Sequence, residues 1–334
     1  MTENEKKIRG ATPRDICVKA VATGVIASAL CSAMAAPVSA YSATWGEEGI
    51  VYSRGISDFD VNYSLHNAGR LNRLHYNLPG IPSRNLYSYK TMALRVGGVR
   101  LSEPAALING ITFIPLRAYA SAIGAAVRYN SSTKTMTVTA DGLYMTASDG
   151  GYVIYANDRP IFNFSPNVVM SNGRMYVSLS SMMKITGQRS SVDSSGVSIT
   201  GSYSPLKSAA AYYREDEVFW LARIITAEAK GESLIGQIAV GNVILNRVAS
   251  SAYPNTIYGV IFDRKYGVQF SPILDGSIYN TPTYTATLAA KICLEGTRLS
   301  EDAMFFLNPR TAQSSWIVNN REYAYTIGGH DFYK

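Results

Sequence analysis

"LARIITAEAKGESLIGQIAVGNVILNRV", residues 221–248, decides how the C-terminal part of this chain folds. At helical spacing Leu221 and Ile224 lie on one apolar side of the first half. Glu228 and Glu232 continue the same stripe. Because an ionised carboxylate is costly to bury, a glutamate aimed at the core needs a physical reason.

The stretch predicts two helices that meet at a bend. Acidic residues 215–217 precede it, where a first turn gains from the positive end of the helix dipole. Gly231 is expected to end the first helix, and Ser233 to cap the second. Gly236 and Gly241 would let the second helix pack closely against the first.

Glu228 would stand just before this bend, flanked by apolar residues and open to a cleft. Such surroundings disfavour the ionised carboxyl, so its pKa is expected to rise toward neutrality. A carboxyl of that kind can donate a proton to a leaving glycosidic oxygen. The alternative is a structural glutamate, either as a helix N-cap or in a salt bridge to Lys230 or Arg223.

Several polar and aromatic residues complete the candidate site. Glu232, one turn after Glu228, would orient the cleft or hydrogen-bond to loop backbone, and a secondary part in catalysis is the alternative. Gln237 would face the same corner, as an N-acetyl-binding amide or as a buried bridge between loops. Candidate substrate-binding residues in the loops that follow are Phe270, Ser271, Asn308, Trp316 and His330. Trp316 is more often a core residue than a sugar platform, and His330, which could assist proton transfer, is more often a structural hydrogen-bonding residue.

The composition indicates folded domains. The chain has 334 residues, of which 47% are hydrophobic and 16% charged, enough for two domains. Its formal charge is +7, and after residue 40 the positive excess lies in residues 41–205. A basic module before a neutral one is typical of attraction to an anionic wall or membrane, or of a well-solvated surface.

Residues 1–40 have the pattern of a secretory signal. Basic residues precede a charge-free, alanine-rich run that ends at Ala40, where cleavage is expected. An uncleaved membrane anchor is the alternative. Cys17 and Cys31 lie in this segment, so only Cys293 would remain and no intramolecular disulfide could form.

The rest of the chain divides into three segments. Residues 41–91 are interpreted as a linker, and residues 92–203 contain two copies of one pattern at an offset of 63. The turn Asn109-Gly110 falls on Asn172-Gly173, and Gly124 falls on Gly187. Each copy therefore predicts a hairpin, whose second strand leads to a short helix and a further strand.

This doubled pattern resembles the copper amine oxidase N-terminal-like domain. The second copy departs from it, with Ser178 where the first has Pro115, and with a shorter end. No copper is expected, because the segment contains neither histidine nor cysteine. A binding or spacing role is the inference for this accessory domain.

Residues 204–334 resemble the SleB-type cell wall hydrolases, the spore cortex-lytic enzymes. The motifs occur in order: "AEAKGESLIGQIAVGNVILNRV", "YPNTIYGVIF", "QFSPILDGSI", "AMFFLNP", "SSWI" and "IGGHDFY". The resemblance implies a mainly helical, lysozyme-related domain, and with the accessory domain an α+β chain. It also implies a lytic transglycosylase that cleaves the MurNAc-GlcNAc bond of peptidoglycan, with Glu228 of the Ala-Glu-Ala motif as catalytic acid and base.

The partner expected from the resemblance is peptidoglycan, of vegetative wall or spore cortex, and an accessory spore protein is a further expectation. No cofactor, metal or nucleic acid is expected, and the protein would be secreted to the wall or spore envelope.

Hydrolysis needs a second carboxylate at a defined separation from the catalytic acid. It stays open as the reaction because several carboxylates are available. The candidates for that carboxylate are Asp263, Asp275, Glu295, Glu301, Asp302, Glu322 and Asp331.

Other enzyme classes fit less well. The three histidines are scattered and no His-Glu-x-x-His motif occurs, which disfavours a zinc peptidase. No Gly-x-Ser-x-Gly elbow is present, and Cys293 lies in an apolar run typical of inert packing. The rival from another class is a wall-binding or spore-envelope protein whose hydrolase-like domain has lost activity.

Overall fold

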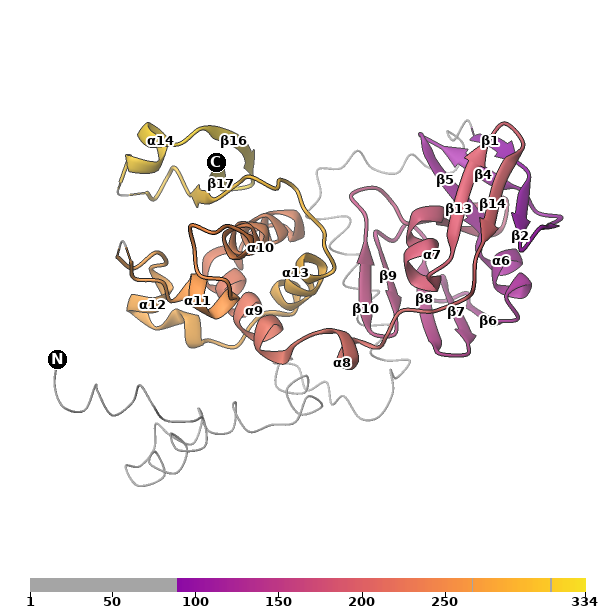
Figure 1. Cartoon of the computed structure of the whole chain (residues 1–334), viewed down its shortest axis with the longest axis horizontal. Coiled ribbons are helices and arrows are strands. Elements are labelled where there is room, and N and C mark those ends of the chain that lie inside the picture. Colours follow the sequence, from indigo (N-terminus) through magenta and orange to yellow (C-terminus); the bar gives the residue numbers. More distant parts are fainter. Residues whose placement is uncertain (1–88, 266, 313) are drawn as a thin grey trace, which may run out of the picture. The chain divides into compact units, whose positions relative to one another are not determined.

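The computed structural model describes residues 89–265, 267–312 and 314–334 (Figure 1). The expected signal segment and residues 41–88 of the expected linker lie outside the described residues. The described chain is β-rich first and mainly helical afterwards, which confirms the predicted fold class. Within it, no helix has the length and apolar character needed to cross a membrane.

Strands of the β-rich region follow one another closely along the chain. They are β1 Tyr89–Met92, β2 Leu94–Val96, β3 Val99–Arg100, β4 Ala105–Ile108, β5 Ile111–Pro115, β6 Ala126–Asn130, β7 Thr135–Ala140, β8 Leu143–Ser148, β9 Val153–Ala156, β10 Arg159–Phe162, β11 Val168–Ser171, β12 Arg174–Ser178, β13 Arg189–Asp193 and β14 Gly196–Thr200. β1 begins three residues inside the expected linker, because it pairs antiparallel with β4.

Two hairpins, β4–β5 and β11–β12, begin the two sequence copies. In both turns the Asn and the Gly have positive φ: 49° and 79° at Asn109 and Gly110, 49° and 73° at Asn172 and Gly173. Positive φ at both central residues is what two-residue hairpin turns require, and Asn-Gly accepts it at low cost. The predicted hairpins are thus confirmed.

A short helix follows each hairpin, as predicted. These helices are α6 Leu116–Ala122 and α7 Leu179–Thr186. Gly124 and Gly187 adopt left-handed backbone just after them, with φ of 74° and 69°. The strands β6–β7 and β13–β14 come next, the latter joined by the shorter connection.

Ser178 replaces Pro115 at the start of α7 and gives that helix a side-chain cap. Its Oγ accepts a hydrogen bond from Ser181 N and donates one to Asn167 Oδ1 at 2.9 Å. Asn167, fully buried, donates in turn to the carbonyl oxygens of Tyr152 and Ile161. The departure from the first copy therefore satisfies buried polar groups that proline could not.

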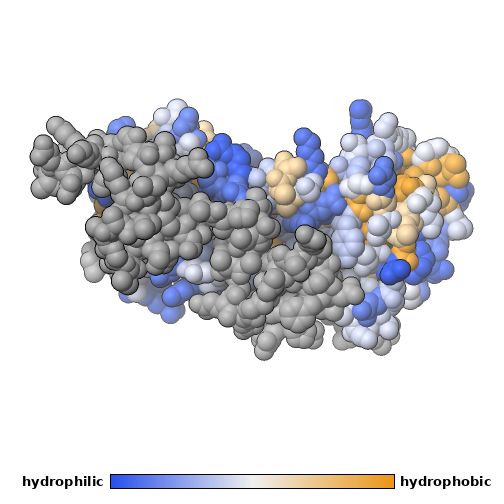
Figure 2. Space-filling view, turned by 90° about the horizontal axis from the view of Figure 1, so that it is seen from below, coloured by the Kyte–Doolittle hydropathy of each residue, from blue (hydrophilic) through white to orange (hydrophobic). Residues whose placement is uncertain are grey.

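Three sheets are built from these strands, in the orders β1-β4-β5-β12-β11, β10-β9-β8-β7-β6 and β13-β14-β2-β3. The two copies join where β5 pairs antiparallel with β12. One continuous core, including Ile114, Tyr119, Met145 and Ile185, lies between the sheets and both helices. Figure 2 shows apolar surface gathered at the right-hand end of the view, the end at which Figure 1 draws the β-rich region.

Helices dominate residues 209–334. They are α8 Ala209–Tyr212, α9 Glu215–Ala229, α10 Leu234–Ala249, α11 Ile257–Ile261, α12 Pro272–Asp275, η1 Ser277–Tyr279, α13 Tyr284–Leu294 and α14 Trp316–Asn320. A small antiparallel sheet of order β15-β17-β16 completes this region, with β15 Phe305–Leu307, β16 Tyr323–Ile327 and β17 His330–Tyr333.

The bend between α9 and α10 forms largely as the sequence predicts. Residues 215–217 stand in the first turn of α9, and Ser233 Oγ accepts from Gly236 N at 3.2 Å. α9 ends at Ala229 with Lys230 as its C-cap, so Gly231 stands just past the helix end, as predicted. The φ of Gly231 is not positive, so this helix end does not use the left-handed backbone that favours glycine.

Close packing of α9, α10 and α13 occurs at Gly241 on α10. A Cβ atom there would lie 2.8 Å from Cys293 Sγ and 2.9 Å from Ile225 Cδ1. Cys293 and Ile225 are both fully buried. The absence of a side chain at Gly241 therefore sets how closely the three helices approach.

Hairpin β9–β10 packs on α13 and carries a buried ion pair to the end of that helix. Arg159 Nε lies 2.7 Å from Glu295 Oε1 and Nη2 lies 3.0 Å from Oε2. Tyr213 Oη donates to the same carboxylate at 2.6 Å, and Lys184 Nζ lies 3.1 Å from it. Burial raises the pKa of Glu295, but these partners outweigh it and hold that pKa below its usual range.

The Gly241→Val substitution tests the packing of the three helices. We expect it to lower the free energy of unfolding by roughly 1–3 kcal/mol, because the side chain must displace buried atoms. Urea unfolding followed by helical circular dichroism measures the change. Gly231→Val is the matched control, since a Cβ at Gly231 meets nothing within 4 Å. Equal stability of both variants would contradict the packing argument.

Candidate active site

Glu228 lies in the last turn of α9, between buried Ile225 and Ala229, and is itself partly buried. Burial, and secondarily the charge of Asp275, raises the pKa of Glu228 from 4.5 to about 7. The direction agrees with the sequence expectation. A carboxyl with this pKa is substantially protonated near neutral pH and can act as a general acid.

The alternative of a structural ion pair at Glu228 has no support among the described contacts. Arg223 Nη1 donates instead to the Ile278 carbonyl oxygen at 3.2 Å, and Lys230 is exposed. Burial without a cationic partner is the arrangement that keeps a carboxyl protonated.

Asp275 is the carboxylate whose charge acts on Glu228. It ends α12, which packs beside α9 (Figure 1), and it is exposed. Hydrogen bonds from the Ser277 side chain and backbone hold the pKa of Asp275 below its usual range. Asp275 thus stays ionised while Glu228 takes up a proton. A protonated general acid and an ionised second carboxylate need these two different protonation states.

The other candidate second carboxylates are occupied or lie elsewhere. Glu295 is enclosed in the ion pair with Arg159. Lys334 pairs with Asp302 and Glu322, at 3.1 and 2.9 Å. Asp263 accepts from Lys265 N, Asp331 from Thr326 Oγ1, and Glu301 is exposed.

Glu232 holds the turn between β16 and β17 against the helix bend. Its Oε2 accepts a hydrogen bond from Gly329 N at 3.1 Å. A Cβ on Gly328, where φ is 59°, would lie 1.9 Å from that oxygen. Only glycine leaves room for this approach, so the geometry favours a positioning role for Glu232.

Gln237 and His330 surround the same turn. Gln237 is 1% exposed, and its Nε2 donates to the main-chain oxygen of Glu232 at 3.0 Å. This arrangement favours the buried bridge over an exposed substrate-binding amide. His330 Nδ1 lies 3.6 Å from Glu232 Oε1, and burial, opposed by Glu232 and Asp331, lowers the pKa of His330. A neutral, buried imidazole suits a structural role.

Phe270 does not fit its predicted role as a substrate-binding residue. It is 3% exposed and packs in the helical core, with its ring centroid 6.4 Å from that of Phe306. The sequence analysis placed Phe270 in a loop, whereas the short helix α12 begins at Pro272, two residues after it. Ser271, at the start of α12, is exposed.

Trp316 and Asn308 lie in the segment that follows β15. Trp316 is 51% exposed, edge-on to Phe305 at 6.4 Å, so the core alternative for this residue is wrong. Asn308 is partly buried, and its Oδ1 accepts from Arg310 N. Its Nδ2 lies near Gly329, which places Asn308 beside Glu232 and His330.

Cys293 takes no part in the site. It is fully buried on α13, and burial raises the pKa of its thiol to about 12. An unionised thiol in the core is inert, as the sequence indicates.

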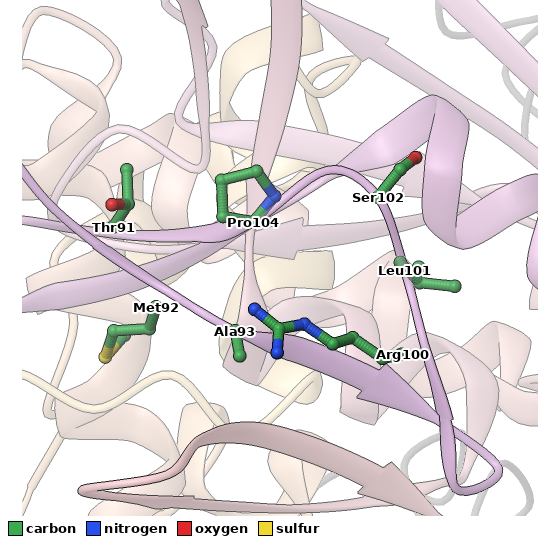
Figure 3. Close-up of a pocket in the computed structure, with 7 residues that line it drawn as sticks. All are labelled: Thr91, Met92, Ala93, Arg100, Leu101, Ser102 and Pro104. Carbon is green, nitrogen blue, oxygen red and sulfur yellow. The ribbon is translucent and has the colours of Figure 1, made fainter.

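A separate hollow of about 600 Å³ lies in the β-rich region (Figure 3). Residues between Thr91 and Pro104 line it, and Figure 3 shows the Arg100 side chain extending toward Ala93. It contributes no residue to the group around Glu228.

Two family models match the chain. "Cell Wall Hydrolase" matches residues 231–333, and "Copper amine oxidase N-terminal domain" matches residues 96–200. Both resemblances inferred from the sequence are thereby confirmed.

Curated relatives match about a third of the chain. The spore cortex-lytic enzyme of Bacillus cereus is 39% identical over 122 residues, which are 36% of this chain and 46% of that protein. The cell wall hydrolase CwlJ of Oceanobacillus iheyensis is 30% identical over 111 residues, 31% of this chain and 77% of that protein. The chain thus spans less than half the length of the Bacillus cereus protein.

Among solved structures, the catalytic domain of the germination-specific lytic transglycosylase SleB from Bacillus anthracis is 39% identical. The match covers 36% of this chain and 97% of that one, with a TM-score of 0.34.

Variants of Glu232 separate positioning from chemistry. Glu232→Ala removes the acceptor for Gly329 N–H, so we expect roughly 1–3 kcal/mol of lost stability in urea unfolding. Glu232→Gln keeps an amide oxygen that can accept this bond and should retain most of the parent's stability and wall-degrading rate. A normally folded Glu232→Gln variant without activity would instead assign Glu232 to the chemistry.

Proposed function

Because the chain belongs to the cell wall hydrolase family, we propose that it degrades peptidoglycan by cleaving the glycosidic bond between MurNAc and GlcNAc. The observation that carries the proposal is the partly buried Glu228 carboxyl, whose pKa stands at about 7. Peptidoglycan degradation is also what the names of the similar proteins indicate, including the spore cortex-lytic enzymes.

Lytic transglycosylation uses one carboxyl twice. Protonated Glu228 donates its proton to the bridging oxygen as the bond to the muramic acid anomeric carbon breaks. The resulting Glu228 carboxylate then accepts the proton of the muramic acid C6 hydroxyl. The oxygen of that hydroxyl bonds to the anomeric carbon at the same time. A 1,6-anhydro product forms without added water, and Glu228 ends protonated as it began.

Hydrolysis is the second candidate, favoured by one observation. The charge of Asp275 acts on Glu228, and the pKa of Asp275 is held below its usual range. A glycosidase can use such a carboxylate to activate water or to stabilise the developing positive charge. The products distinguish the two reactions, because hydrolysis adds water and leaves a reducing end.

Spore cortex is the substrate we favour over vegetative wall, since the curated relatives include spore cortex-lytic enzymes. An accessory spore protein remains a proposed partner. Secretion to the wall or spore envelope follows from this substrate.

Digestion of purified peptidoglycan and spore cortex by the parent chain and Glu228→Gln tests the proposal. We expect anhydro-muropeptides from the parent, identified by mass spectrometry, and a rate roughly 10²- to 10⁴-fold lower for the variant. The neutral glutamine avoids burying an ionised carboxylate, so the variant should fold at least as stably at pH 8. Products with an added water and a reducing end would identify the reaction as hydrolysis. If neither protein released any product, a wall-binding function would be favoured.

The pH dependence tests the coupling between Glu228 and Asp275. Cleavage should fall as pH rises through about 7, because Glu228 loses its proton there. The folded-state pKa exceeds the unfolded value, so this group's contribution to stability is also lost as pH rises from about 4.5 to 7. Asp275→Asn removes a negative charge and should move the descending limb to lower pH. An unmoved limb in a folded variant would contradict the coupling.

A further inference from the structure

A cluster of aromatic side chains lies on the helical region outside the site described above. Trp220 of α9 contacts Tyr258 of α11 and Tyr279 of η1, with ring centroids 5.2 and 6.5 Å apart. Phe219 and Phe262 pack edge-on to Trp220 at 4.9 and 5.2 Å. We call Trp220, Tyr258 and Tyr279 the aromatic surface.

The aromatic surface is exposed to solvent in a way that a core cluster is not. Tyr258 and Tyr279 are each 52% exposed, while Trp220 between them is partly buried. The contacts to Phe219 and Phe262 fix the Trp220 ring. Single exposed aromatic residues need no explanation, but a rigid group contributed by three elements indicates a binding surface.

The aromatic surface lies on the helix that carries the candidate acid. Trp220 precedes Glu228 by eight residues on α9, about 12 Å along the helix axis. The segment formed by α12 and η1 runs beside this helix, and Arg223 holds it there through the Ile278 carbonyl oxygen. Asp275, at one end of the segment, acts on Glu228, and Tyr279, at the other, contacts Trp220.

Aromatic rings of this kind match the chemistry of a sugar ring. The face of a pyranose presents C–H groups with slight positive charge, and the face of an aromatic ring is negative. Tyrosine adds a hydroxyl that can hydrogen-bond to sugar hydroxyl or N-acetyl groups. Binding costs little side-chain conformational entropy, because each tyrosine side chain has few rotatable bonds.

We propose that the aromatic surface binds N-acetylated β-1,4-glycan, as a subsite along α9 for the strand that reaches Glu228. The inference rests on the proposed function, which supplies the glycan as substrate. It adds a binding role for Trp220, Tyr258 and Tyr279 that requires no cleavage.

Binding is measured on the full chain with Glu228→Gln, so that cleavage does not interfere. The probe is a soluble β-1,4-linked N-acetylglucosamine oligomer, which lacks peptide stems, titrated by calorimetry. Tyr258→Ala with Tyr279→Ala should weaken binding roughly tenfold. Tyr258→Phe with Tyr279→Phe keeps both ring faces and should bind within a few-fold of the parent. Tyr129→Ala, an exposed tyrosine on β6, is the control and should leave affinity unchanged.

A second measurement needs no substitution in the aromatic surface. The oligomer should protect Tyr258 and Tyr279 of the same protein from chemical nitration, mapped by mass spectrometry, and leave Tyr129 reactive. Unchanged affinity in a folded alanine variant, or equal nitration with and without oligomer, would overturn the proposal. These readouts differ from cleavage by the parent chain, so failure of the subsite is distinguishable from failure of the proposed reaction.

Discussion

The close approach of α9, α10 and α13 at Gly241 is the constraint on which the helical region depends. Cys293 Sγ and Ile225 Cδ1 fill the space that a side chain at Gly241 would take. This contact fixes the direction of α9, and therefore where its last turn places Glu228. The capped start of α10 then sets the bend directly after that turn. A dense interior transmits such placement because it offers few alternative packings.

The bend between α9 and α10 sets the surroundings of Glu228 and also the contact with the Gly328–Gly329 turn. The raised pKa of Glu228 comes first from desolvation and second from Asp275, which arrives on a separate short helix. Glu232 contacts the Gly328–Gly329 turn instead. Glu228 in α9 and Glu232 in the bend after it thus have different surroundings, which argues for different roles. The β-rich region adds a buried ion pair at the end of α13, whose removal from one side would leave an uncompensated charge.

Local chemistry made much of the fold predictable. Asn-Gly turns, the glycines after α6 and α7, the Ser233 cap and the acidic first turn of α9 each act within a few residues, so the chain shows them directly. Gly231 follows the end of α9 as predicted, but its backbone is not left-handed, because Lys230 caps the helix in right-handed conformation. The prediction of Phe270 as a substrate-binding residue is wrong because Phe270 packs in the helical core. An aromatic residue beside a serine occurs both in exposed loops and in cores, and the local sequence does not distinguish the two.

The sequence by itself determined the order of the two regions, the duplicated pattern, the helical corner and Glu228 as its unusual carboxyl. Tertiary structure alone decided which of seven carboxylates acts on Glu228, that Gln237 is enclosed, and that Trp316 is exposed. It also brought Trp220, Tyr258 and Tyr279 together across three elements. The reason is physical. Capping and turn preferences act over a few bonds, whereas burial, the electrostatic effect of one charged group on another, and contacts between aromatic rings arise between segments distant in the chain.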